Sequence, residues 1–456
     1  MKYDAVIIGS GVGGYPAAAY LADRGLKVAV VEEHHLGGEC TNYGCVPSKA
    51  LYSIAESLRA LEKTGATVDY RWSSIVDWVK GIVKDAREGV KHLLEARDVS
   101  IFQGKGVLRS GRRVEVRSEN GVRELEAESI LVAVGTDPAD IPAARFDGEG
   151  VVSNREALYF NEKPESVLIV GGGVIGVELA NIYASFKSEV VVVELLDHIL
   201  PFTDRDVALA LKTHLQQLGV RVLEKTSVVK VEKTNGVYLA ELTNGEKLKV
   251  DKVVVAVGRK PKTAGIGLED AGVELDSKGF VRVNQYMETA AQGIYASGDC
   301  VGGPLLAHKA ILESLVAAKR IASEEAFTLD YKLVPITIFT GLEVASVGYT
   351  EKELQNMGVK YVKVRVPLAY LSSVRIKGYK NAFVKVLYDE GFERVYGVHI
   401  VAPNASEVVS SYIPLYAGVL KPRDLRRIPY PHLTVSESLR DLAEYILGEP
   451  VHLIKR

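Results

Sequence analysis

The chain has 456 residues, which is too many for a single hydrophobic core and enough for about three domains of ~150 residues each. Its 56 basic and 58 acidic residues give a net charge of −2, a balance that argues against a nucleic-acid or membrane partner. Only three cysteines occur, so we do not expect a secreted disulfide framework.

The chain begins almost directly with a strand-like run, Ala5-Val6-Ile7-Ile8, which leaves no room for a signal peptide. No apolar run approaches the ~20 residues needed to span a bilayer, and the valine-rich runs are short enough to be buried strands. These features predict a cytoplasmic protein without a membrane segment.

One pattern occurs twice: a buried strand, a glycine turn leading into a helix, and a second strand that ends in an acid. It covers Ala5 to Glu32 and Val167 to Glu194, and in both copies 23 positions separate the first glycine from the acid. Similar strands at 130–135 and 253–258 close the two copies. We interpret the pattern as a duplicated module, with the second copy inserted into the first. From about Tyr331, shorter alternating strands mixed with helices indicate a third, α+β domain.

Both glycine turns fit the spacing G-x-G-x-x-G. The missing side chains allow a tight turn and let N–H groups at a helix N-terminus approach a pyrophosphate. The expected contact positions are Gly9, Gly11 and Gly14 in the first copy and Gly171, Gly173 and Gly176 in the second. An ordinary glycine turn is the alternative for a single copy, but two copies with strand, helix and spaced acid favour two dinucleotide sites.

The acids that end the second strands are Glu32 and Glu194. A carboxylate at this place can accept hydrogen bonds from a ribose 2′-hydroxyl, and it repels a 2′-phosphate. Glu194 therefore favours NAD over NADP in the second site. The alternative is a solvated acid at the end of a strand.

Two cysteines, Cys40 and Cys45, lie in the segment GGECTNYGCVPSK at residues 37–49. An ideal helix would separate them by ~7.5 Å and point them apart, so a disulfide between them requires irregular backbone. Gly44 can supply it, and Pro47 suits the first turn of a helix that starts near Cys45, where the helix dipole lowers a thiolate pKa. A metal site and two inert thiols are the alternatives, although no second ligand pair has metal-binding spacing and we expect no metal.

These motifs resemble those of the class I pyridine nucleotide-disulfide oxidoreductases, and most closely those of the branch that oxidises dihydrolipoamide. The resemblance covers nearly the whole chain and includes the segments Ile294–Asp299, Leu306–Ala310 and Ser346–Glu351. The resemblance implies that the first fingerprint and Glu32 bind the ADP half of FAD, that Asp299 binds its ribityl-phosphate portion, and that the second fingerprint binds NAD. The further cofactor contacts that we expect are Gly38, Lys49, Gly135, Ala307 and Gly258.

The same resemblance implies roles for the reactive side chains. Cys45 would face the flavin, and Cys40 would exchange with the substrate. Lys49 and Glu178 match a lysine–glutamate pair beside the flavin's reactive nitrogen, where a buried charge needs a partner. A generic pair of helix residues is the alternative. Cys300 matches no catalytic position, and we expect it to be a small buried hydrophobe.

Thiol–disulfide exchange needs a base, and a histidine held by a carboxylate suits neutral pH. His432 and Glu437 match the family's C-terminal signature His-Pro-Thr-x-x-Glu, in which the partner subunit contributes the histidine, so we expect a homodimer. Leu433 replaces the proline of this signature, and Leu342 replaces another family proline. The His–Pro bond is usually cis in the family, and a trans bond would shift the imidazole. Without the resemblance, a surface pair would be the preferred interpretation.

The predicted fold class is α/β, with two Rossmann-like dinucleotide-binding domains and a C-terminal α+β interface domain for dimerisation. We place the FAD-binding domain at residues 1–149 and 265–330, the NAD-binding domain at 150–264 and the interface domain at 331–456. The predicted enzyme oxidises dihydrolipoyl groups through Cys40, Cys45 and FAD and reduces NAD⁺ to NADH. Its substrate would be free lipoamide or a lipoyl-bearing protein of a 2-oxoacid dehydrogenase or glycine cleavage complex.

Reductases of the same class that act on glutathione, another low-molecular thiol or mercuric ion are the nearest alternatives. Glutathione enzymes usually prefer NADP and carry basic residues near the position of Glu194, and mercuric enzymes carry a C-terminal cysteine pair; this sequence has neither feature. A soluble transhydrogenase is disfavoured because its counterpart of Cys45 is typically not cysteine. Only the two leucines in place of prolines favour a flavoprotein that has lost turnover.

Overall fold

The first strand, β1 (Lys2–Ile8), is buried on both faces because its apolar residues are consecutive. Ala5 and Ile7 pack into one core, and Val6 and Ile8 pack into another on the opposite face. The computed structural model, which describes residues 1–454, places this strand within a seven-stranded sheet. The other strands of this sheet are β2 (Val28–Glu32), β3 (Ser100–Gln103), β4 (Lys105–Arg109), β5 (Arg113–Ser118), β6 (Gly121–Val132) and β17 (Ile294–Ala296).

The strand order is β3-β2-β1-β6-β5-β4, and β17 pairs with β6. The parallel strands β2, β1 and β6 continue into turns at the same sheet edge, which is where ligands bind in such folds. Helices α1 (Tyr15–Ala22) and α8 (Ala307–Ile321) pack against each other over one face of the sheet. The chain between β2 and β3 forms α2 (Gly38–Tyr43), α3 (Cys45–Glu62) and α4 (Trp72–Glu95).

The second module repeats this arrangement in a five-stranded parallel sheet of order β11-β10-β9-β15-β8. Its strands are β8 (Val151–Val152), β9 (Ser166–Val170), β10 (Glu189–Glu194), β11 (Arg221–Glu224) and β15 (Lys252–Val255). Its helices are α5 (Asn154–Ala157), α6 (Val174–Ser185) and α7 (Arg205–Gln217). A three-stranded antiparallel sheet follows β11 and consists of β12 (Val228–Thr234), β13 (Val237–Leu242) and β14 (Lys247–Val250).

The chain passes between the two modules through two short strands that pair with each other. These are β7 (Thr136–Pro138) and β16 (Arg259–Pro261), which are antiparallel. After β16 the chain returns to the first module, where β17 completes the sheet. The second copy is therefore inserted into the first, as the sequence predicts.

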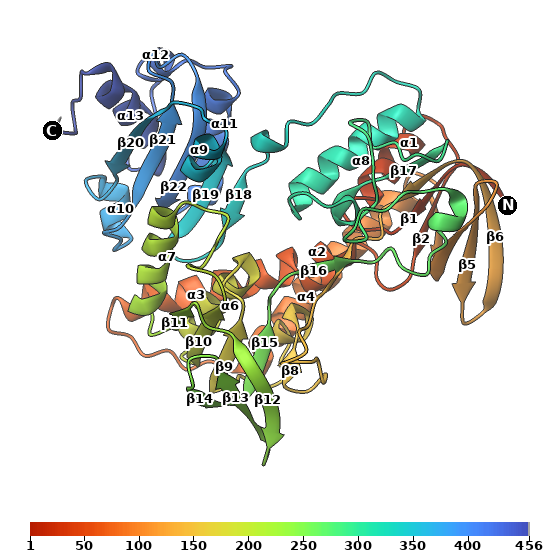
Figure 1. The fold of residues 1–456 in the computed structure, drawn as a ribbon, viewed down its shortest axis with the longest axis horizontal. Coiled ribbons are helices and arrows are strands. Elements are labelled where there is room, and N and C mark those ends of the chain that lie inside the picture. Colours follow the sequence, from red (N-terminus) through yellow and green to blue (C-terminus); the bar gives the residue numbers. More distant parts are fainter. Residues whose placement is uncertain (455–456) are drawn as a thin grey trace.

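The C-terminal part is an antiparallel sheet of order β18-β19-β22-β21-β20 (Figure 1). Its strands are β18 (Ile336–Ile338), β19 (Glu343–Gly348), β20 (Val362–Pro367), β21 (Phe383–Tyr388) and β22 (Val395–Ala402). Its helices are α9 (Glu351–Asn356), α10 (Ser372–Ile376), α11 (Ala405–Tyr416), α12 (Pro422–Leu425) and α13 (Ser438–Leu447). Single 3₁₀ turns occur at Glu269–Ala271, Gly298–Val301, Tyr331–Leu333 and Val435–Glu437.

A shared core joins α3, α4, the second module and the C-terminal sheet. The predicted fold class is confirmed, whereas the domain boundaries given above stay a prediction. No helix within residues 1–454 combines the length and the apolarity needed to cross a membrane.

Candidate active site

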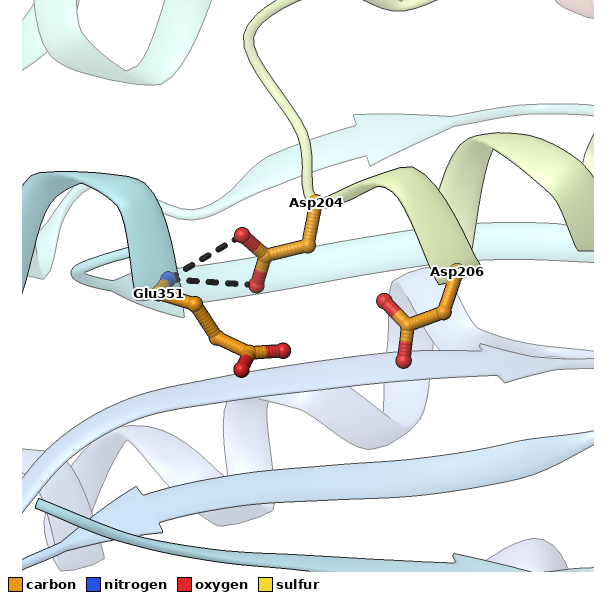
Figure 2. Close-up of side chains that lie close together, drawn as sticks. All are labelled: Asp204, Asp206 and Glu351. Atoms are coloured by element: carbon orange, nitrogen blue, oxygen red, sulfur yellow. Dashed lines mark hydrogen bonds between the residues drawn. The ribbon is translucent and has the colours of Figure 1, made fainter.

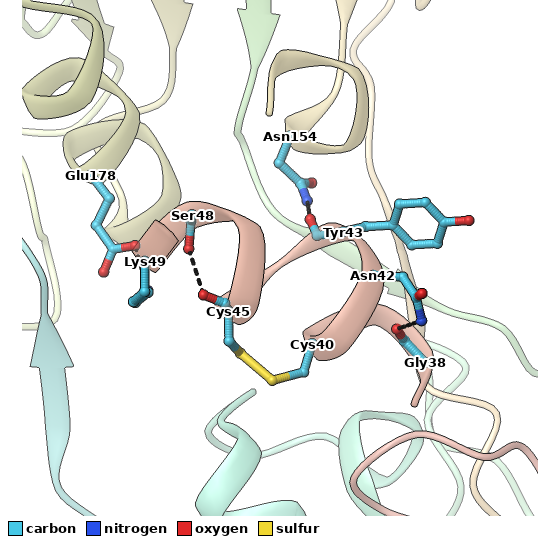
Figure 3. The surroundings of a disulfide bond; sticks show 9 residues. All are labelled: Gly38, Cys40, Asn42, Tyr43, Cys45, Ser48, Lys49, Asn154 and Glu178. Atoms are coloured by element: carbon cyan, nitrogen blue, oxygen red, sulfur yellow. Dashed lines mark hydrogen bonds and ion pairs between the residues drawn. A yellow bond between two sulfur atoms is a disulfide. The ribbon is translucent and has the colours of Figure 1, made fainter. Parts of the chain in front are cut away.

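A break between two helices brings the two cysteines together. Gly44 ends α2 with φ −134° and ψ −105°, and α3 begins at the next residue, Cys45. The Cα atoms of Cys40 and Cys45 are 4.7 Å apart, and their sulfurs form a disulfide (Figure 3). The predicted irregular backbone at Gly44 and the predicted helix start at Cys45 are both confirmed. The first-turn N–H groups of α3 favour a negative charge on a sulfur at this position.

The helix that carries Cys40 is anchored by the second module, which the sequence did not reveal. Arg155 donates to Glu39 from Nη2 at 2.6 Å and from Nε at 2.9 Å, and Arg259 Nη2 lies 3.0 Å from the other carboxylate oxygen. Asn154 Nδ2 donates to the carbonyl of Tyr43 at 2.8 Å. In the sequence, the only local indication of this anchor is that an acidic residue, Glu39, directly precedes Cys40.

Lys49 on α3 and Glu178 on α6 lie next to each other (Figure 3). Lys49 Nζ donates to Glu178 Oε2 at 2.8 Å, and the N–H of Phe339 donates to Oε1 at 3.0 Å. The Glu178 side chain is 8% exposed and that of Lys49 is 33% exposed. The predicted pair therefore forms, one helical turn after Cys45, and its lysine remains accessible.

The first fingerprint has the geometry that a pyrophosphate-binding turn requires. Gly9 has φ +102°, and a Cβ added at Gly14 would collide with the carbonyl oxygen of Gly9. Glu32 is buried, and its carboxylate accepts the N–H and hydroxyl of Ser10 at 2.9 and 2.6 Å and the N–H of His34 at 2.8 Å. These contacts hold the carboxylate at the mouth of the turn, as ribose binding needs.

The second fingerprint reproduces this geometry. Gly171 has φ +110°, and a Cβ at Gly176 would collide with the carbonyl oxygen of Gly171. The buried carboxylate of Glu194 accepts the N–H of Gly172 at 2.7 Å and of Leu196 at 2.8 Å. Glu194 is therefore fixed at the site and not a solvated strand-end acid.

One cavity of about 2320 Å³ connects both fingerprints and the disulfide. It exceeds the ~300–1,000 Å³ of a typical small-ligand site and has room for more than one dinucleotide. The predicted site residues that line it are Gly9, Gly11, Glu32, Gly38, Cys40, Cys45, Lys49, Gly135, Gly171, Gly173, Glu178, Glu194, Gly258, Asp299 and Ala307. Gly14 and Gly176, which lie at the helix starts, do not line it, and neither do His432 and Glu437.

Asp299 faces this cavity from the turn after β17. Burial raises the pKa of its carboxyl group, and Thr136 Oγ1 donates to it at 3.2 Å. A buried ion pair supports the turn: Lys309 donates to the carbonyls of Gly298 and Gly302 at 3.1 and 2.7 Å, and Glu313 accepts the N–H of Gly298 at 2.9 Å. The cavity, the glycine cradles and the fixed carboxylates fit FAD in the first site and NAD in the second.

His432 and Glu437 also form the predicted pair. Nδ1 of His432 lies 3.0 Å from Glu437 Oε1, and the imidazole is 82% exposed. Because the described residues contain no cis peptide bond, the bond between His432 and Leu433 is trans. The pair lies outside the cavity that contains the disulfide, so one protomer does not bring the base to the sulfurs. Cys300, as predicted, is fully buried.

Three carboxylates that do not line this cavity also lie close together (Figure 2). Oxygens of Asp204, Asp206 and Glu351 lie within 4.8 Å of one another. The ammonium group of Lys385 is already among them, at 2.7, 2.6 and 3.0 Å. The cluster joins α7 of the second module to the C-terminal sheet through a buried lysine. Lys363 beside Glu351 and Arg365 beside Asp206 offset the two remaining negative charges.

The fold and the site together define a dinucleotide-dependent disulfide oxidoreductase. The family model for "Pyridine nucleotide-disulphide oxidoreductase" matches residues 3–314, and the dimerisation domain of that family matches residues 334–443. The chain belongs to the pyridine nucleotide-disulphide oxidoreductase family.

Individual relatives match over nearly their whole length. Dihydrolipoyl dehydrogenase of Thermus scotoductus is 38% identical over 100% of this chain and 99% of its own. Dihydrolipoyl dehydrogenase of Trypanosoma brucei brucei is 35% identical over 96% of this chain and 95% of its own. LpdA from Mycobacterium tuberculosis superposes with a TM-score of 0.91 at 26% identity, over 97% of this chain and 99% of its own. The flavoprotein disulfide reductase RclA from Escherichia coli, solved as a Cu(II) complex, superposes with a TM-score of 0.90 at 26% identity, over 98% and 100%.

Membership makes the chain an oxidoreductase that acts on sulfur groups and uses FAD and NAD. The matched dimerisation domain supports a homodimer.

Proposed function

We propose that the protein is a dihydrolipoyl dehydrogenase that oxidises dihydrolipoyl groups with NAD⁺. The observation that carries the proposal is the Cys40–Cys45 disulfide in one cavity with two dinucleotide fingerprints. Curated relatives that are named dihydrolipoyl dehydrogenase match the full chain and favour this substrate.

The chemistry of the chain's own residues follows from this arrangement. His432 takes a proton from a substrate thiol, and the thiolate attacks Cys40, so that the disulfide breaks and Cys45 leaves as a thiolate. The second substrate thiol then attacks the mixed disulfide and gives its proton to the departing Cys40 sulfur, which completes the lipoyl disulfide. FAD held by the first fingerprint would supply the two-electron chemistry that links the reduced cysteines to NAD⁺ held by the second fingerprint.

We propose that Cys45 is the thiolate nearer the flavin. It starts α3, where the free N–H groups of the first turn stabilise negative charge. Lys49, one turn later on α3, is held by Glu178 at 2.8 Å and adds a cation on the same side of the helix. The base would come from the second protomer, because His432 is exposed and lies outside its own protomer's cavity.

We further propose that the lipoyl group is free lipoamide or is carried by a 2-oxoacid dehydrogenase or glycine cleavage complex. We place the enzyme in the cytoplasm, since three cysteines are too few for a secreted disulfide framework.

The test compares substrates and one cysteine variant on the purified holoenzyme. Dihydrolipoamide with NAD⁺ should give a much larger kcat/KM than glutathione disulfide with NADH or NADPH. Cys45→Ser should abolish this turnover and retain FAD, whereas the matched control Cys300→Ser should retain both, because Cys300 is buried in a separate core. Full turnover in Cys45→Ser would show that Cys45 takes no part in the mechanism. If the enzyme reduced another disulfide faster than it oxidised dihydrolipoamide, it would instead be a disulfide reductase of the same family.

A further inference from the structure

The turn that carries His432 has a backbone conformation that proline cannot adopt. Leu433 has φ +62°, in the left-handed region that non-glycine residues visit rarely. Proline is restricted to φ near −65° and has no N–H. The leucine that replaces the proline of the family signature therefore has a backbone conformation that the proline could not have. Across this turn, Thr434 Oγ1 donates to the carbonyl of Pro431 at 2.8 Å.

The conformation directs the Leu433 N–H toward Glu437. This N–H donates to Glu437 Oε2 at 2.9 Å, while Oε1 lies 3.0 Å from His432 Nδ1. The carboxylate is thus held through both oxygens by two adjacent residues. Glu437 is 14% exposed and lies in the 3₁₀ turn that leads into α13, so its backbone is fixed by the fold.

The second hydrogen bond matters because the terminal torsion of a glutamate is broad and leaves a singly held carboxylate free to swing. Within residues 1–454, Glu437 is the one side chain that hydrogen-bonds the His432 imidazole, which is 82% exposed. The plane of this carboxylate consequently sets the direction of the ring. An ionised carboxylate accepts the proton of Nδ1, which leaves Nε2 as the basic nitrogen.

We infer that Leu433 is a positioning residue for the acid–base pair and acts through its backbone N–H on Glu437. This inference rests on the proposed function, because the pair is the base of that reaction. The leucine side chain, which is 49% exposed, is not the active element. The structure thereby gives a physical role to a residue that departs from the family signature.

The experiment uses the FAD-loaded dimer and two variants at one position. Leu433→Pro removes the N–H and forbids the observed φ, whereas Leu433→Gly keeps the N–H and readily adopts that φ. Enzyme reduction by dihydrolipoamide is followed by stopped flow, and NADH oxidation by ferricyanide reports the half of the cycle that does not use His432. We expect Leu433→Pro to slow the dihydrolipoamide half-reaction roughly 10- to 100-fold, the size of a lost hydrogen bond to a charged group, with ferricyanide reduction unchanged. Leu433→Gly should stay close to the parent enzyme in both assays.

A double variant separates positioning from a general effect on folding. If Leu433 acts through Glu437, then Leu433→Pro should cause little further loss in a Glu437→Ala background, because the acceptor is already absent. A full parental rate in Leu433→Pro, an equal loss in Leu433→Gly, or additive losses in the double variant would overturn the inference. If the parent enzyme does not oxidise dihydrolipoamide at all, the proposed function fails instead, and the two failures are distinguishable.

Discussion

Lys385 connects two parts of the molecule through a buried charge cluster, and this gives a prediction of defined size. The lysine lies on β21 of the C-terminal sheet with a side chain that is 0% exposed. Its ammonium group contacts Asp204 and Asp206 of the second module and Glu351 of α9 at 2.7, 2.6 and 3.0 Å. Burial alone would lower the pKa of Lys385, but hydrogen bonds to Asp204 and Asp206 hold it above its usual value. The lysine is therefore charged throughout the neutral range.

Lys385→Met keeps the length of the side chain and removes the charge, which leaves three carboxylates within 4.8 Å of one another. Removing one partner of a buried ion pair costs about 3–5 kcal/mol, and here the loss falls mainly on Asp204, which is 7% exposed and loses its lysine partner. At about 2–4 °C per kcal/mol, the thermal midpoint of the holoenzyme should fall by roughly 10 °C. Differential scanning calorimetry measures this shift, and the C-terminal sheet should unfold earlier than in the parent.

The matched control is Lys363→Met. Lys363 donates to the same Glu351 at 2.9 Å, but its side chain is 49% exposed. An exposed pair contributes at most about 1 kcal/mol, so the control should lose only a few degrees. Equal shifts in the two variants would refute the argument that burial, and not the mere presence of an ion pair, determines the loss.

Two further predictions concern the second module. Glu194→Ala should lower kcat/KM for NAD⁺ roughly 10- to 100-fold, because the ribose loses a charged acceptor, and should affect NADP⁺ less. Steady-state kinetics with both coenzymes measure this, and an equal loss with both would contradict it. His214 is buried, which lowers the pKa of its imidazole from the usual 6.5 to about 3. Because the unfolded chain binds this proton below pH 6.5 and the folded chain does not until about pH 3, stability should fall on acidification through that window by at most about 1.4 kcal/mol per pH unit. Urea unfolding at pH 7 and pH 5 should show a smaller difference in His214→Gln than in the parent, and an unchanged difference would exclude His214 as the cause.

Local sequence predicts the redox-active segment well because its geometry is decided within a few residues. Two cysteines five positions apart cannot bridge on a continuous helix, and Gly44 is the residue between them that tolerates a break. The structure has the break at Gly44 and begins α3 at Cys45. The two fingerprints are equally local, since a tight turn and its closing acid lie within one strand–helix–strand unit.

Long-range contacts are what the sequence could not give. Glu39 is held by Arg155, 116 positions away, and nothing in either local sequence indicates the other. The sequence of the strand Phe383–Tyr388 contains a lysine, which would be expected to face solvent, yet all six residues of the strand are buried. Lys385 is buried there because its partners come from α7 and α9, and their approach depends on the packing of the second module against the C-terminal sheet.

In both fingerprints, a backbone N–H of the glycine turn donates to the carboxylate that ends the second strand. Any difference in function between the two sites must therefore come from the residues that surround the turns. Gly38 approaches the first fingerprint so closely that a Cβ there would lie 2.6 Å from the Cα of Gly11, and a Cβ at Gly13 would lie 3.1 Å from the Cα of Gly298. The turn of the first site is thus covered by the disulfide segment and by the turn of Asp299. In the second site, a Cβ at Gly173 would meet no atom of residues 1–454 within 4 Å, and the neighbouring Leu195 and Leu196 are 67% and 51% exposed. A covered turn suits a resident cofactor and an open one suits a coenzyme that must exchange in each cycle, which supports the proposed assignment of FAD to the first site and NAD to the second.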